Sequence, residues 1–88
     1  MLYVATYCCS DDERRSRIGE VVASLSDNSW SVRDDVWVLE SDDHATKLRD
    51  QIKRHLRDDE SVIVALLAGH AAWHGYDAES EDWLLAHL

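Results

Sequence analysis

Apolar and polar positions follow two different periods along this chain, and the periods predict an alternation of strands and helices. Residues 2–8, LYVATYC, are continuously apolar or β-favouring, which predicts a strand that is buried on both faces. Ser10 then opens a helix whose first turn is acidic, and turn residues at 26–28 end that helix. Its apolar stripe consists of Ile18, Val21, Val22 and Leu25.

Residues 29–39 alternate weakly around the polar triplet 33–35, so two short strands and one bent strand both remain open. Ser41 or Asp42 is expected to cap a second helix, which the acidic residues 58–60 end. The buried stripe of that helix is expected to consist of Ala45, Leu48, Ile52 and Leu56.

The strongest strand signal is the β-branched and aliphatic run at 61–67, SVIVALL, which predicts a central strand. Residues 79–88 are expected to add a short helix, with Trp83, Leu84 and Leu88 on one face. The chain lacks proline, has three glycines and contains no linker-like stretch, so residues 1–88 are expected to form a single ferredoxin-like domain.

The predicted order is β-α-β-β-α-β with a short C-terminal appendage, which is an α/β (α+β) chain of the ferredoxin-like class. Helices that cross over between the strands would pack on one face of the sheet and form a two-layer sandwich. The other face would stay open. Four tryptophans and no phenylalanine make that open face a candidate surface for a homodimer.

Charge narrows the choice of partners. Nine Lys and Arg against eighteen Asp and Glu give a net charge of −9, so the overall field does not attract nucleic acid. An acidic decoy or inhibitor of a basic partner is one alternative that this charge leaves open. The predicted second helix carries the one local basic cluster, which we interpret as a solvated helix face, so that nucleic-acid binding is not favoured. The cluster consists of Lys47, Arg49, Lys53, Arg54 and Arg57.

Two adjacent cysteines, Cys8 and Cys9, form neither a disulfide framework nor a CxxC-type zinc site. The N-terminal residues lack a basic leader and no apolar run approaches the length of a membrane span, so we expect a cytoplasmic protein without membrane attachment. Cys8 is a candidate nucleophile because a helix start follows it. We favour the alternative of a buried cysteine at the end of the strand.

His70, His74 and Asp77 are spaced so that one helical turn could bring them together around zinc. The helical pattern there is poor, and solvated histidines are the favoured interpretation. The chain also lacks GxSxG, P-loop and GxGxxG motifs. We therefore assign no catalytic, cofactor-binding or metal-binding residue.

The segments 7–18, 35–41, 48–50 and 58–64 together resemble the CRISPR-associated Cas-two proteins and their SinR-type relatives. The resemblance implies a ferredoxin-like homodimer. In active members of that family, an Asp at the end of the first strand is proposed to hold a divalent metal for phosphodiester cleavage, and this position matches Cys8 here. A thiol is a poor ligand for Mg²⁺.

Asp11 and Asp12 offer carboxylates near this position, but we interpret both as helix-capping or dipole-stabilising residues. The expected function is therefore a non-catalytic homodimer that acts through protein contacts. A metal-dependent nuclease of the same fold is the enzyme alternative, and Mg²⁺ would be needed only in that case.

Overall fold

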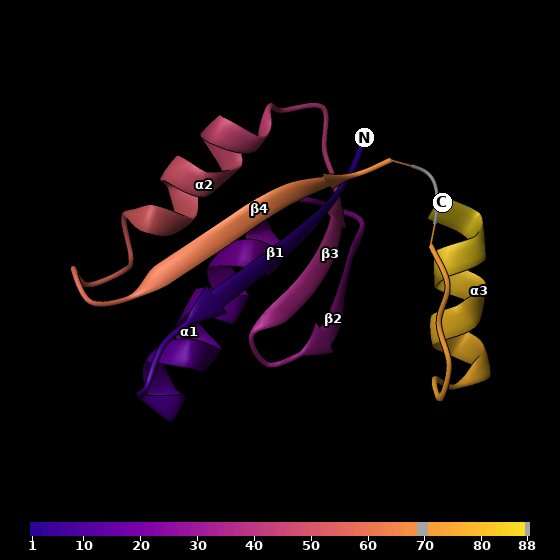
Figure 1. The fold of residues 1–88 in the computed structure, drawn as a ribbon, viewed down its shortest axis with the longest axis horizontal. Helices are drawn as coiled ribbons and strands as arrows, with labels where there is room; N and C mark the ends of the chain where they lie inside the picture. The colour runs from indigo at the N-terminus through magenta and orange to yellow at the C-terminus, as the bar shows by residue number, and fades with distance from the viewer. Residues whose placement is uncertain (69–70, 88) are drawn as a thin grey trace.

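Four antiparallel strands form one sheet in the order β2-β3-β1-β4, and two helices pack on one of its faces (Figure 1). The computed structural model describes residues 1–68 and 71–87. The element order confirms the ferredoxin-like β-α-β-β-α-β prediction, and the segment 29–39 forms two strands. The strands are β1 (Leu2–Cys8), β2 (Ser29–Arg33), β3 (Val36–Glu40) and β4 (Ser61–Leu67), and the helices are α1 (Asp12–Ser24), α2 (Ala45–Lys53) and α3 (Ala78–His87).

The core lies between the sheet and the helices α1 and α2. Alternate residues of β1 face the helices, so Tyr3, Ala5 and Tyr7 are buried there. The two predicted helical stripes meet them: Ile18 and Val22 are buried on α1, and Leu48 and Ile52 are buried on α2. Burying an aliphatic side chain of this size contributes about 1.5–3 kcal/mol. The outer members of both stripes, Val21, Leu25, Ala45 and Leu56, are half-buried.

The prediction that residues 61–67 form a central strand is wrong. β1 is paired on both sides, by β3 and by β4, whereas β4 pairs only with β1 and lies at the edge of the sheet. α2 carries the chain from β3 past β1, and that crossover places β4 on the far side of β1. The apolar run therefore ends up partly in solvent, with Ile63 62% and Leu66 53% exposed.

The helix starts follow two different capping residues. Asp11, and not the preceding Ser10, caps α1, in agreement with the capping interpretation of this carboxylate. The predicted caps of α2, Ser41 and Asp42, are wrong: His44 is the N-cap, and its Nδ1 accepts a hydrogen bond from the backbone N–H of Thr46 at 3.2 Å. Ser41 closes a preceding turn, in which its hydroxyl oxygen accepts the backbone N–H of Asp43 at 3.0 Å.

The C-terminal helix packs through aromatic rings. The ring of Trp30, on the sheet face away from α1 and α2, lies 5.4 Å from the ring of Tyr76 and 6.0 Å from that of Trp83. Leu84 is buried and Trp83 is half-buried, which is consistent with the single face predicted for them, while Leu88 lies outside the described residues. Among residues 1–68 and 71–87, no helix combines the length and apolar character needed to cross a membrane.

Neither Trp30 nor Trp37 lies on an open sheet surface, so these two tryptophans do not supply the dimer surface that we expected there. Trp37 pairs in register with Ala5 and thus faces the helices, where its ring approaches Gly19. Trp30 is covered by the C-terminal aromatic residues. The sheet surface that stays accessible lies at the other edge, on β4.

Candidate functional site

The junction between β1 and α1 corresponds to the position at which the resemblance implies a metal-binding carboxylate. Asp11 caps α1 there: its Oδ1 accepts the backbone N–H of Glu13 at 3.0 Å and that of Arg14 at 3.4 Å. Asp12 accepts a hydrogen bond from the Arg15 guanidinium at 2.8 Å. Both carboxylates thus stabilise the start of the helix, which confirms the capping interpretation.

The two cysteines at this junction have opposite environments. Cys8 ends β1 opposite Ser61 and is exposed, so the expectation of a buried cysteine at the strand end is wrong for Cys8. Cys9 is the buried one. Its thiol lies 3.6 Å from the carbonyl oxygen of Asp11, and the Arg14 guanidinium approaches its sulfur to 3.2 Å. Cys9 therefore packs within the fold, and Cys8 presents its thiol to solvent.

Arg14 connects the start of α1 to the distant connection between α2 and β4. Its guanidinium bonds to the carboxylate of Glu60 at the start of β4 and donates to the carbonyl oxygen of His55 at 2.8 Å. Glu60 also accepts the backbone N–H of Arg57 at 2.7 Å. The hydrogen bond from Arg14, followed by contacts with Cys9 and Arg57, lowers the pKa of Glu60 to about 2. This ion pair fixes the end of the α2–β4 connection against α1.

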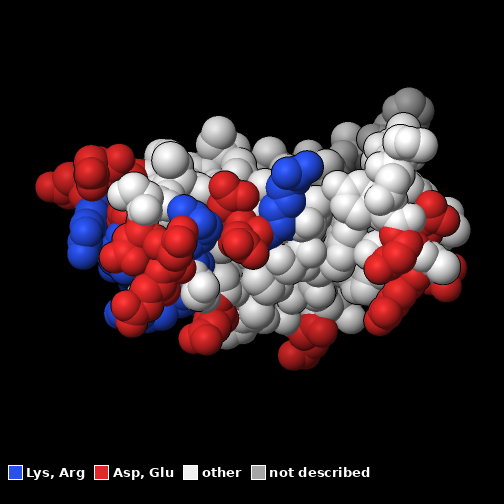
Figure 2. Space-filling view, turned by 90° about the horizontal axis from the view of Figure 1, so that it is seen from below, with Lys and Arg blue, Asp and Glu red and all other residues white. Residues whose placement is uncertain are grey.

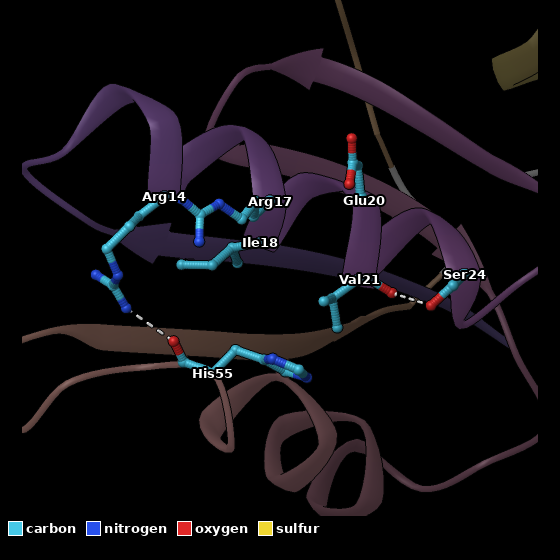
Figure 3. A pocket seen from close by; sticks show the side chains of 7 residues that line it. All are labelled: Arg14, Arg17, Ile18, Glu20, Val21, Ser24 and His55. Carbon is cyan, nitrogen blue, oxygen red and sulfur yellow. Dashed lines mark hydrogen bonds between the residues drawn. The ribbon is translucent and has the colours of Figure 1, made fainter.

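A groove of about 430 Å³ separates α1 from the end of α2 (Figure 3). Three of its polar side chains, those of Arg14, Arg17 and Ser24, are bonded within the protein. Arg14 reaches across to the His55 carbonyl, Arg17 pairs with Glu13 at 2.9 Å, and the Ser24 hydroxyl donates to the Val21 carbonyl at 2.6 Å. The two guanidinium groups and the Ser24 hydroxyl are therefore engaged in bonds that stabilise the fold. The lining comprises Arg14, Arg17, Ile18, Glu20, Val21, Ser24 and His55.

A second groove, of about 620 Å³, runs between the end of α2 and the outer edge of β4. Leu56 and Val62 give it an apolar part, and the cations Lys53 and Arg57 lie on it. We call this the α2–β4 groove. It is lined by Arg49, Lys53, Leu56, Arg57, Asp58, Glu60, Ser61 and Val62.

The predicted basic cluster is only partly neutralised. Lys47 pairs with Asp43 at 3.2 Å and Arg49 with Asp50 at 2.9 Å. Within the described ranges 1–68 and 71–87, no carboxylate forms an ion pair within 4 Å of the side-chain charge of Lys53, Arg54 or Arg57. These three exposed cations lie near the α2–β4 connection. Positive charge is thus available at this end of the molecule.

The charges are strongly segregated along the molecule. All Lys and Arg precede residue 58, whereas residues 77–82 contain four acids. On the face seen in Figure 2, blue side chains gather toward the end away from α3, and the end that carries α3 shows only red ones. The protein therefore has a mixed end at α1 and α2 and a purely acidic end at α3.

The histidine cluster that was considered for zinc does not assemble in the part that can be described. His70 lies outside the described residues, and His74 is exposed. Asp77 is hydrogen-bonded to the first turn of α3. Its Oδ1 accepts the Ser80 backbone N–H at 2.8 Å, and this bond lowers the pKa of Asp77. Within residues 1–68 and 71–87, no three or more His, Cys, Asp or Glu side chains are grouped so that they could hold a metal ion.

Comparison with known proteins supports the fold only. No family model matches the chain, and no curated protein matches it. A hypothetical protein TT1823 from Thermus thermophilus has a similar structure, with a TM-score of 0.66 and 22% sequence identity. The similarity covers 85% of this chain and 90% of that protein. The likeness extends over the ferredoxin-like architecture and carries no activity with it.

Proposed function

We propose that this protein is a small, non-catalytic ferredoxin-like homodimer that acts through protein contacts, similar to the Cas-two and SinR-type proteins. The observation that carries the proposal is the unpaired outer edge of the entirely uncharged strand β4, on which Ile63 and Leu66 are more than half exposed. Exposed apolar edge strands present both unpaired backbone groups and apolar side chains, so they pair readily with another chain.

The two edges of the sheet differ in how they are protected. β2 is short, has a register irregularity between Ser31 and Arg33, and carries a charge at Arg33. Bulges and charges of this kind prevent edge-to-edge pairing. β4 pairs with β1 in unbroken register over seven residues, from Ser61 to Leu67, and none of those residues is charged. The β4 edge is therefore the one suited to association.

The chemistry at the β1–α1 junction supports a non-catalytic role. Mg²⁺ prefers hard oxygen ligands, whereas Cys8 presents a thiol and the nearby Asp11 carboxylate caps a helix. We also place the protein in the cytoplasm, because Cys8 and Cys9 are both free thiols and a reducing compartment preserves them.

The proposal is tested by measuring the mass in solution. Multi-angle light scattering behind size-exclusion chromatography, over a range of micromolar concentrations, should give the mass of two chains. The mass of one chain at every concentration would contradict the homodimer.

A second candidate function, binding to a basic protein partner, is favoured by the acidic end of the molecule. Asp77, Glu79, Glu81 and Asp82 lie there with no Lys or Arg after residue 57. Such an end would steer a cationic partner. Replacing Glu79 and Asp82 by Gln and Asn should weaken a salt-sensitive complex with that partner, while replacing Asp58 and Asp59 by Asn should not.

A further inference from the structure

We propose that two copies associate edge to edge through β4, antiparallel and with Val64 on the two-fold axis. In this arrangement Leu66 of each copy fills the α2–β4 groove of the other. The inference rests on the proposed homodimer and specifies its interface. It would extend the four-stranded sheet continuously into a second copy.

Symmetry restricts the register of this pairing. Residues that lie opposite each other in an antiparallel pair project to the same face of the sheet. A residue can therefore not lie opposite its own neighbour in sequence, and the two-fold axis must pass between the two copies of one residue. With Val64 on the axis, all seven residues of β4 are paired, from Ser61 opposite Leu67 inward. Ile63 then lies opposite Ala65, a large side chain beside a small one. No like charges face each other, because the strand carries none.

The same register provides a position for the exposed Leu66. Leu66 pairs with Tyr3 and Val62 pairs with Tyr7, so both side chains project to the helix-covered face. Across the two-fold axis, Leu66 of the second copy lies opposite Val62. Val62 and Leu56 form the apolar part of the α2–β4 groove. An apolar side chain that is 53% exposed in the single chain thus meets the apolar part of the groove.

Charge favours the same arrangement. β4 runs from the α2 end of the molecule toward the end that carries α3 (Figure 1). Rotation by 180° about the middle of β4 brings the acidic end of the second copy to the side on which Lys53 and Arg57 lie. It also keeps the two acidic ends far apart, which limits the repulsion between two chains of net charge −9.

Paired substitutions test the two contacts by light scattering and sedimentation. Leu66→Ser should weaken the dimer at least about tenfold, whereas Leu85→Ser, at a position 68% exposed on α3, should leave it unchanged. Lys53→Glu should weaken the dimer, whereas Lys47→Glu makes the same charge change at the other end of α2 and should have little effect. Circular dichroism and urea unfolding of each variant confirm that it is folded.

Disulfide trapping tests the register. In a Cys8→Ser background, Ile63→Cys and Ala65→Cys variants are mixed under reducing conditions and then oxidised. The mixture should give a linked dimer, while each variant alone should not, because like positions are offset by two residues and lie beyond the roughly 7 Å limit for a disulfide.

The outcomes separate this inference from the proposed function. A wild-type mass of one chain at all concentrations would overturn both. A wild-type dimer that survives Leu66→Ser, together with a mixture of the Ile63→Cys and Ala65→Cys variants that does not link, would overturn the β4 interface and leave the homodimer standing. Linking through a Thr6→Cys variant alone would indicate instead that the open sheet faces stack on each other.

Discussion

At the scale of single residues, the ion pair between Arg14 and Glu60 has the largest sequence separation of the ion pairs within residues 1–68 and 71–87. The two residues are 46 positions apart, and their pair brings the start of α1 to the start of β4. The folded protein holds the pKa of Glu60 at about 2, below its ordinary value of 4.5. A carboxyl group with a lowered pKa contributes stability that is fully present above its ordinary pKa and is lost as the pH falls.

We therefore predict that Glu60→Gln lowers the urea midpoint at pH 7. The difference from the wild type should shrink as the pH falls from 4.5 toward 2, because the wild-type carboxylate becomes protonated over that range. Urea unfolding at a series of pH values, followed by circular dichroism, measures this. Asp59→Asn is the control, since Asp59 is an exposed neighbour, and a constant difference for Glu60→Gln at all pH values would refute the prediction.

A second prediction concerns Trp37. Its ring faces the helices and lies 3.5 Å from the position that a Cβ would occupy on Gly19, so its removal would leave a cavity between β3 and α1. Trp37→Ala should lower the free energy of unfolding by about 3 kcal/mol, whereas Lys47→Ala, on the exposed face of α2, should change it by no more than about 0.5 kcal/mol. Equal urea midpoints for the two variants would show that Trp37 is not part of the core.

At the scale of the elements, the start of α1 distinguishes a capping role from a metal-binding role for Asp11. We predict that Asp11→Ala costs about 1 kcal/mol of stability, while Asp11→Asn costs little, because an amide oxygen caps a helix as well as a carboxylate does. Thermal unfolding with and without Mg²⁺ measures both variants. A wild-type midpoint that rises with Mg²⁺, and does so only while Asp11 is a carboxylate, would instead indicate a metal site.

The sequence was sufficient to predict the elements other than the division of residues 29–39 into two strands, because their apolar patterns are local. The stripes at Ile18 and Val22 and at Leu48 and Ile52 have helical spacing, and both pairs are buried as expected. The position of β4 was predicted wrongly, because a continuous apolar run resembles a strand that is buried on both faces. The topology determines the position of β4, because the crossover through α2 carries the chain past β1 to the edge of the sheet.

The contacts around the candidate site were less predictable, because they also depend on the tertiary arrangement of the elements. His44 became the cap of α2 through its ring nitrogen, although Ser41 and Asp42 are the more usual capping residues. Nothing in the pattern links Arg14 to Glu60, or Leu66 to the groove beside Leu56, because these relations depend on how the helices are placed over the sheet. Pairwise tertiary contacts between distant segments leave no periodic signal in one sequence.

At the scale of the whole molecule, charge and surface chemistry both favour a protein partner over nucleic acid. A field of net charge −9 repels polyanions, and the cations lie intermixed with acids at one end. The end that carries α3 has no Lys or Arg, since none follows residue 57. An uncharged edge strand between these ends is a surface on which another protein chain can pair, whereas a nucleic-acid backbone would meet mostly negative charge.

We accordingly predict that the protein does not cleave RNA or DNA in the presence of Mg²⁺ or Mn²⁺. In-line displacement at phosphorus requires neutralisation of the developing charge and an activated water, which a carboxylate-bound metal would supply. The exposed end of β1 offers the Cys8 sulfur where an oxygen is needed, and Asp11 is engaged by two backbone N–H groups. Cys8→Asp should at most create weak metal binding, measurable by calorimetry.

The decisive measurement is an assay of rigorously purified wild type and Cys8→Asp on labelled single-stranded RNA and duplex DNA, each with an EDTA control. We expect no EDTA-sensitive turnover from the wild type. Turnover that is abolished both by EDTA and by Asp12→Asn would show that the Asp12 carboxylate leaves Arg15 to bind a metal. Such activity would require local contacts to the nucleic-acid backbone that outweigh the repulsion from the acidic surface. The intermixed cations near the end of α2 would then be the residues to test for those contacts.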